Sequence, residues 1–149
     1  MKRPDFMGLA LAEAEAAAAR GEVPVGAVIA GGGEVVASAG NRTRELSDPT
    51  AHAEMLVIRE AAAKHSAERL GGMDLYVTLE PCAMCAGAIS FARIRRLYFG
   101  ASDEKGGAVV SGVRFFSSPT CHHAPEIYPG IGEQNASAIL RDFFRSRRE

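Results

Sequence analysis

Three residues that are far apart in the chain have the types and spacing of metal ligands. Cys82 and Cys85 are three residues apart at the expected start of a helix, so both sulfur atoms should lie on one face of its first turn. The unpaired backbone N–H groups and the positive dipole end there favour thiolates, the form that binds metal. A C-x-x-C pair alone fits either a redox pair or half of a zinc site. His52, also at an expected helix start, would supply a third ligand, which leaves a tetrahedral Zn²⁺ one open position, as in catalytic sites.

Glu54 distinguishes a catalytic metal site from a structural one. In a regular helix, residues i and i+2 point about 200° apart. His52 and Glu54 can therefore face one metal only in an irregular first turn, where Asp48-Pro49-Thr50 places them. A carboxylate there could take a proton from an activated water and pass it to a leaving group, whereas a structural site would need a fourth Cys or His. Each residue alone has a structural explanation, as a capping or core histidine, a small apolar cysteine or a first-turn acid. Together they predict one Zn²⁺ per chain on His52, Cys82 and Cys85, with Glu54 as the catalytic acid–base.

Composition limits the class of protein that can carry this site. The 149 residues are 47% hydrophobic and 23% charged, which fits a single folded domain over residues 1–149. The formal net charge of −1 excludes a bulk polycation. Residues 1–90 hold eight basic and twelve acidic residues, and residues 91–149 hold nine and six. This asymmetry is either ordinary surface variation or a basic face for an anionic partner.

The same data predict a cytoplasmic protein. No apolar stretch approaches the length of a membrane span. Lys2 and Arg3 are followed by a run that contains Glu13 and Glu15, which a secretory signal would not carry. An odd, low count of three cysteines suits a reducing compartment.

Helical and strand patterns alternate along the chain, which predicts a layered α/β domain. A Gly31-Gly32-Gly33 turn should join two strands into a hairpin. The expected helices cover residues 5–20, 51–64, 81–91 and 132–148, and the expected strands cover 25–30, 34–38, 75–79 and 96–101. Residues 113–130 are expected to be irregular, and Cys121-His122-His123 within them is expected to be a loop rather than a second metal site.

The H-x-E and P-C-x-x-C pair is typical of zinc-dependent nucleobase deaminases, and the chain resembles the cytidine-deaminase-like superfamily. It is most similar to the bacterial tRNA-specific adenosine deaminases. The narrower similarity lies in Asn41, in TLEPCAMCAGA at residues 78–88 and in Phe143-Phe144-Arg145. Thr43 and residues 109–123 depart from the family pattern. The resemblance implies an α/β/α three-layer sandwich with a mixed five-stranded central sheet, and a homodimer.

The resemblance also implies a reaction, the conversion of adenosine to inosine at wobble position 34 in the anticodon loop of tRNA-Arg. Asn41 would then bind the target nucleoside, the backbone of Ala53 and the Val23-Pro24 segment would line the base pocket, and Asp103, Lys105 and Phe144 would touch the flanking RNA.

Two rival functions are compatible with the same residues. One is a free-base or nucleotide deaminase, acting on guanine or cytosine, with the same fold. The other is a zinc-stabilised RNA-binding module without turnover, which Glu54 and the missing fourth ligand argue against. Seven arginines could form a phosphate-binding rim, or each could be an ordinary surface charge: Arg93, Arg95, Arg96, Arg141, Arg145, Arg147 and Arg148.

Overall fold

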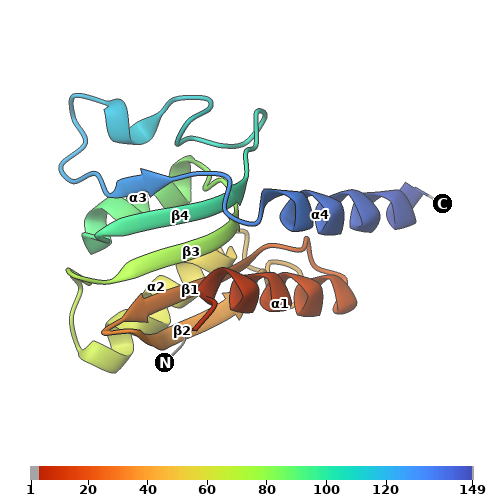
Figure 1. The fold of residues 1–149 in the computed structure, drawn as a ribbon, viewed down its shortest axis with the longest axis horizontal. Helices are drawn as coiled ribbons and strands as arrows, with labels where there is room; N and C mark the ends of the chain where they lie inside the picture. The colour runs from red at the N-terminus through yellow and green to blue at the C-terminus, as the bar shows by residue number, and fades with distance from the viewer. Residues whose placement is uncertain (1–3, 149) are drawn as a thin grey trace.

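The computed structural model of the chain describes residues 4–148, except for the side chain of Arg148. Lys2 and Arg3, which were compared with the start of a secretory signal, lie outside this range. The elements follow one another as α1 (Phe6–Ala19), β1 (Gly26–Gly31), β2 (Glu34–Gly40), α2 (Ala53–His65), β3 (Asp74–Leu79), α3 (Ala83–Ala92), β4 (Arg96–Ala101), the 3₁₀ turn η1 (Phe115–Ser117), β5 (Glu126–Tyr128) and α4 (Glu133–Arg148) (Figure 1).

The five strands form one mixed sheet in the order β2-β1-β3-β4-β5. β1 is antiparallel to β2 and β3, while β4 is parallel to β3 and to β5. The hairpin between β1 and β2 turns at Gly32 and Gly33, whose φ angles of +60° and +80° suit glycine. β5 is an addition to the sequence prediction, because it lies in the 113–130 segment that was expected to be irregular.

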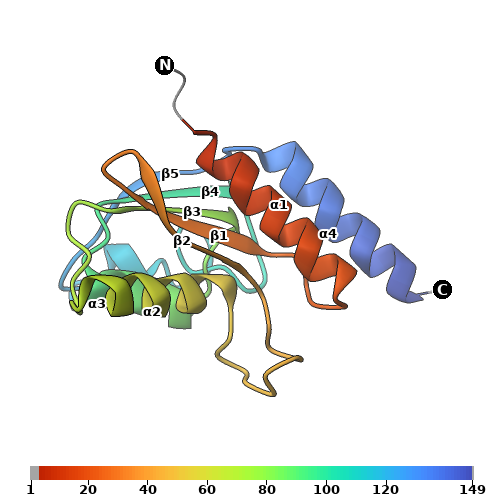
Figure 2. The same ribbon diagram turned by 90° about the horizontal axis from the view of Figure 1, so that it is seen from below.

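Helices cover both faces of the sheet, as the α/β/α prediction requires. α1 and α4 lie side by side on one face, and α2 and α3 lie on the other (Figure 2). The larger core lies between the sheet and α2 and α3, and includes the fully buried Ile29, Leu75 and Phe99. No helix within residues 4–148 is long and apolar enough to span a membrane.

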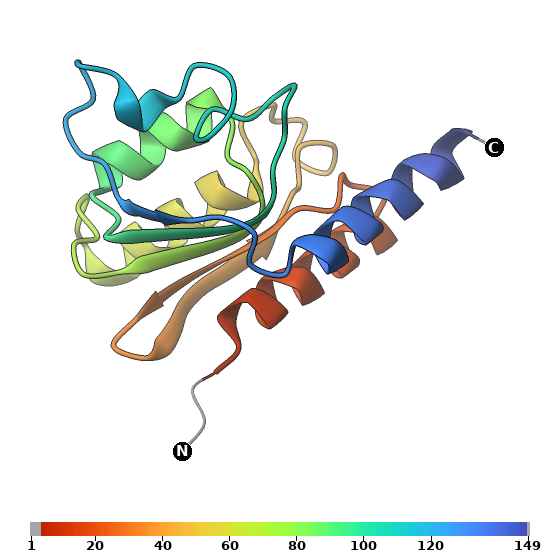
Figure 3. The same cartoon turned by 45° about the horizontal axis from the view of Figure 1, so that its top comes forward.

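Small side chains let α1 approach the sheet closely. Ala10, Ala14 and Ala17 of the alanine-rich helix are fully buried. A Cβ atom on Gly26 would lie 2.0 Å from the carbonyl oxygen of Ala10, so only glycine fits at the start of β1. The C-terminal end of α4 extends beyond the sheet (Figure 3).

Candidate active site

The three predicted metal ligands meet where two helices begin. His52 is the N-cap of α2 and Cys82 is the N-cap of α3, and neither side chain caps its own helix. Nδ1 of His52 lies 3.7 Å from Sγ of Cys82 and 3.6 Å from Sγ of Cys85. All three ligand atoms lie within 4.8 Å of one another, and across residues 4–148 this is the one group of three or more His, Cys, Asp or Glu side chains placed to hold a metal ion.

The two cysteines differ in their protonation because they lie against each other. A hydrogen bond from the Cys85 thiol, with a second contribution from His52, lowers the pKa of Cys82 to about 4. The same contact, together with burial, raises the pKa of Cys85. The hydrogen bond with Cys82 raises the pKa of His52, against the effect of burial. The lowered pKa of Cys82 favours its thiolate, the protonation state that metal binding needs.

Glu54 lies in the first turn of α2 and is only 4% exposed. Burial raises the pKa of its carboxyl to about 7, although its own backbone N–H and the nearby His52 act in the opposite direction. His52 has an extended backbone (φ −72°, ψ 152°), so the regular helix begins only at Ala53. This irregular start lets His52 and Glu54 border the same cavity, as the sequence argument required. A carboxyl with a pKa near neutrality suits a group that both accepts and donates a proton.

A cavity of about 320 Å³ opens over these residues. Of the predicted substrate contacts, Asn41, Val23 and Asp103 line it. Asn41 is held by the start of α2, because its Oδ1 accepts a hydrogen bond of 2.8 Å from the backbone N–H of Ala53. The side-chain amide NH₂ of Asn41 is therefore the end that a ligand can use.

The other predicted contacts do not line the cavity. Pro24 is buried beside Val23, and Ala53 is fully buried behind Asn41, to which its backbone N–H donates. Lys105 is exposed on the loop after β4, and Phe144 is 45% exposed on α4. Their proposed contact with RNA remains a prediction. Thr43, which departs from the family pattern, does line the cavity.

Sequence reasoning missed two buried carboxylates beside the cavity, Glu22 and Glu80, which are 1% and 2% exposed. Burial opposes their ionisation, but hydrogen bonds from backbone N–H groups more than offset it and lower the pKa of each carboxyl. Glu80 also lines the cavity. The sequence did carry a signal for Glu80, because it is an acidic residue directly after a buried strand and two positions before the metal ligand Cys82.

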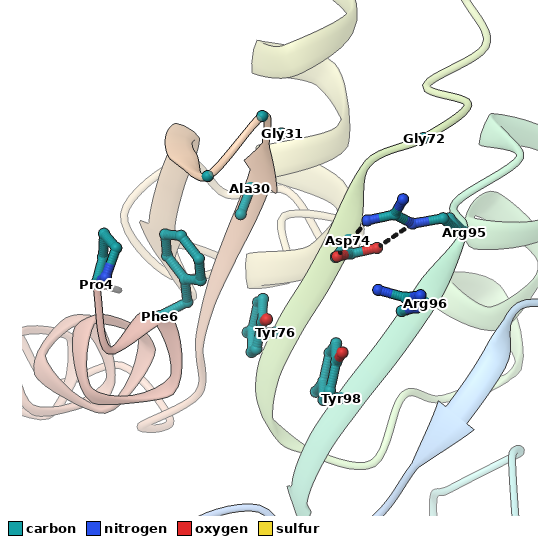
Figure 4. A pocket seen from close by; sticks show the side chains of 12 residues that line it. Pro4, Phe6, Ala30, Gly31, Gly72, Asp74, Tyr76, Arg95, Arg96 and Tyr98 are labelled. Carbon is teal, nitrogen blue, oxygen red and sulfur yellow. Dashed lines mark hydrogen bonds and ion pairs between the residues drawn. The ribbon is translucent and has the colours of Figure 1, made fainter. Parts of the chain in front are cut away.

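A second cavity, of about 280 Å³, lies at the opposite end of the sheet (Figure 4). Asp74, the first residue of β3, lines this second cavity, whereas Leu79, the last residue of β3, lines the cavity over the metal cluster. Tyr76 and Tyr98 stack in this region with ring centroids 4.4 Å apart. Arg95 pairs with Asp74 at 3.0 Å.

The arginines suggested as an RNA-binding rim are accordingly divided between two parts of the molecule. Arg95 and Arg96 lie at the end of the sheet remote from the metal cluster, and Arg96 pairs with Glu126 at 2.8 Å. Arg141, Arg145 and Arg147 are exposed on α4. Arg93 is the C-cap of α3 and so lies at the end of that helix remote from Cys82, its N-cap.

The Cys121-His122-His123 segment is a loop anchored to α3 and to the turn between α3 and β4. Ser90 of α3 donates its hydroxyl hydrogen to the carbonyl oxygen of His123 at 2.7 Å. Nε2 of His123 lies 2.8 Å from the carbonyl oxygen of Ile94. These contacts indicate that His123 holds the loop against α3 and the turn before β4.

A mixed sheet between two helical layers, with a His-Cys-Cys cluster and a buried glutamate at two helix starts, defines a metal-dependent deaminase of the cytidine-deaminase-like type. Residues 1–148 match the family model of the MafB19-like deaminases, and the chain belongs to this family.

Individual relatives narrow the similarity. The chain is 65% identical over 147 residues to the tRNA-specific adenosine deaminase of Agrobacterium fabrum, covering 99% of this chain and 97% of that one. A structure from a study of A-to-I editing by tRNA:A34 deaminases superposes with a TM-score of 0.90 at 66% identity, covering 91% of this chain and 98% of that one. A guanine deaminase from Nitrosomonas europaea superposes with a TM-score of 0.76 at 23% identity, over 93% and 82% of the two chains, and shares the fold.

Proposed function

We propose that this protein hydrolyses adenosine 34 of tRNA-Arg to inosine in the anticodon loop and releases ammonia. The observation that carries the proposal is the position of Glu54, buried beside a three-ligand cluster at the floor of a cavity. A structural metal site has no use for such a carboxyl. The 65% identical relative and the 66% identical structure, both described as acting on tRNA adenosine, support the choice of substrate.

Zinc is the metal that fits the cluster best. A tetrahedral Zn²⁺ with bonds of about 2.3 Å to sulfur and 2.0 Å to nitrogen separates these ligands by about 3.5 Å. The N–S separations of 3.6 and 3.7 Å agree with one ion per chain, held by His52, Cys82 and Cys85. When bound there, zinc would supply a water molecule of lowered pKa.

Glu54 moves the protons of the reaction. It accepts a proton from the water that attacks C6 of adenine and delivers it to N1. It then takes the proton of the new C6 hydroxyl group and passes it to the departing amino group, which leaves as ammonia. Because one group gives and takes the proton within one turnover, a pKa near neutrality serves both steps.

The cavity walls bind and orient the nucleoside. Asn41, held in place by the backbone N–H of Ala53, forms one side, and Val23 forms an apolar part of the wall. A base reaches such a cavity only after leaving its stack, which costs least in a single-stranded loop. Asp103 at the cavity, Lys105 beside it and Phe144 on α4 are the candidate contacts to flanking nucleotides.

The assembly that we propose is a homodimer through the face of α2 and α3 that points away from the sheet. Phe91 is 75% exposed on α3, and with Ile58 and Ala88 it lines a shallow cavity of about 390 Å³. A large exposed aromatic ring among apolar neighbours is typical of an interface. The reaction would take place in the cytoplasm, where tRNA is modified and three free cysteines stay reduced.

A substrate panel tests the function. The purified protein is incubated separately with an anticodon stem-loop bearing adenosine 34, guanine, cytosine and cytidine, and ammonia and inosine are measured. Inosine from the stem-loop alone supports the proposal. Ammonia from a free base would replace it with a free-base deaminase. RNA binding without product from the zinc-loaded protein would replace it with a binding module.

A further inference from the structure

Glu80 accepts five hydrogen bonds from one distant segment of the chain. Its Oε2 accepts from the backbone N–H groups of Val109, Val110 and Ser111, each at 2.9 Å. Its Oε1 accepts from the backbone N–H of Asp103 at 2.9 Å and from the hydroxyl of Ser111 at 3.0 Å. A carboxylate that is 2% exposed has thus become the centre around which residues 103–111 are folded.

The segment is built to close around this carboxylate. A Cβ atom on Gly107 would lie 2.4 Å from Cδ of Glu80, so the backbone passes where only glycine fits. Gly112 has a φ angle of +57°, and a Cβ atom there would lie 2.4 Å from the carbonyl oxygen of Gly107. The backbone N–H of Ala108 also donates to the carbonyl oxygen of Pro81 at 2.9 Å. The segment is therefore attached to the two residues that precede Cys82.

The same segment forms one wall of the substrate cavity. Asp103 and Gly106 border the cavity, and Lys105 lies between them in sequence. Oδ1 of Asp103 accepts hydrogen bonds from the backbone N–H groups of Lys105 at 3.2 Å and Gly106 at 3.0 Å, so the wall follows the position of Asp103. That position is fixed in turn by the hydrogen bond to Glu80.

We propose that Glu80 is a positioning residue for the deamination reaction, which holds the 103–111 wall at a fixed distance from the metal ligands and so sets the shape of the substrate cavity. The kinetic part of this inference rests on the proposed function, whereas the structural part does not. Glu80 would act through the wall and not through the reacting atoms, which Glu54 serves.

Glu22 does the same for the opposite wall and provides a matched comparison. Its carboxylate accepts from the backbone N–H groups of Arg44 at 3.1 Å and Glu45 at 2.8 Å. These residues belong to the loop that carries Asn41 and Thr43 to the cavity. Each buried carboxylate should therefore control one wall and leave the other unchanged.

Hydrogen exchange measured by mass spectrometry on Glu80→Gln, Glu22→Gln and wild-type protein tests the structural part. In Glu80→Gln the side-chain NH₂ group replaces one carboxylate oxygen and cannot accept hydrogen bonds from the donors that face it. Exchange in residues 103–111 should therefore accelerate on the order of 10- to 100-fold. Residues 41–48 and the strands should exchange as in wild type. Glu22→Gln should show the reverse pattern. Unchanged exchange in 103–111, or equal acceleration throughout the chain, would overturn the proposal.

Kinetics on the anticodon stem-loop test the positioning role. Glu80→Gln should raise KM about tenfold or more with zinc content unchanged, because a misplaced wall weakens contacts made before and during reaction. Glu126→Gln, which removes an exposed carboxylate paired with Arg96 at the far end of the sheet, should keep wild-type KM. If Glu80→Gln has wild-type KM, the wall does not depend on Glu80.

Two further measurements keep the outcome clear. If Glu80→Gln does not fold, Ser111→Ala removes only the hydroxyl donor, and should accelerate exchange in the same segment a few-fold; no acceleration there would overturn the proposal. If wild-type protein does not deaminate the stem-loop, the proposed function fails, while the exchange pattern still decides whether Glu80 holds the wall.

Discussion

Replacing Glu54 with glutamine should stabilise the metal-free protein at pH 8, even though it should abolish deamination. Burial raises the pKa of this carboxyl from 4.5 to about 7 in the folded protein. Folding therefore disfavours the ionised form of the carboxyl. The difference between the two pKa values corresponds to ~3 kcal/mol of unfolding free energy. Below pH 4.5 the group is protonated in both states and costs nothing. As the pH rises through about 7, wild-type protein loses this stability, whereas the glutamine variant does not.

Urea denaturation of both metal-free, reduced proteins at pH 5 and pH 8 measures the effect. The free-energy gap between variant and wild type should grow by ~2.5 kcal/mol between these values, because part of the effect is already present at pH 5. Glu60→Gln serves as the control, since Glu60 is an exposed residue of the same helix, paired with Lys64 at 3.3 Å. A gap that is the same at both pH values would refute the assignment of Glu54 as a buried, neutral-range carboxyl.

Three further predictions concern the metal, the cavity and the interface. Removing the metal with a chelator should abolish inosine formation and lower the melting temperature, and Zn²⁺ but not Mg²⁺ should restore both, because thiolate and imidazole ligands suit zinc; full activity after complete metal removal would contradict this. Asn41→Ala, which removes the acceptor for the N–H of Ala53 at 2.8 Å, should raise KM for the stem-loop about tenfold with zinc content unchanged, and an unaltered KM would exclude Asn41 from binding. Phe91→Glu should convert a dimer to a monomer in light scattering, whereas the control Glu15→Gln, at an exposed position of α1, should remain a dimer. A persistent dimer in Phe91→Glu would exclude the proposed interface.

Local patterns were sufficient to predict most of the fold. The glycine turn predicted the β1–β2 hairpin, and the alternation of helices and strands predicted a layered α/β domain. The family resemblance implied the helical layers on both faces of the sheet. The resemblance implied a fifth strand, but local patterns did not locate β5, because it has only three residues, none of them buried, within a segment rich in proline and glycine. It pairs with β4 through the backbone, which leaves little trace in the side-chain pattern.

The metal cluster was predictable for a related reason. His52 and Cys82 both precede helices, and helix-start signals in the sequence predicted that each residue lies at the N-terminal end of a helix. The roles of Glu22 and Glu80 were not predictable in the same way. Their partners are backbone N–H groups more than twenty residues away, and a backbone donor has no residue type to recognise.

The most direct test of the account is one sample of Glu54→Ala in which zinc content and inosine at position 34 of tRNA-Arg are both measured. His52, Cys82 and Cys85 remain in this variant, so it should keep one zinc ion per chain. Inosine formation should fall by at least ~10²–10⁴ relative to wild type, because the proton carrier is gone. Normal inosine formation by the zinc-loaded variant would contradict the central claim that Glu54 carries the protons of the reaction.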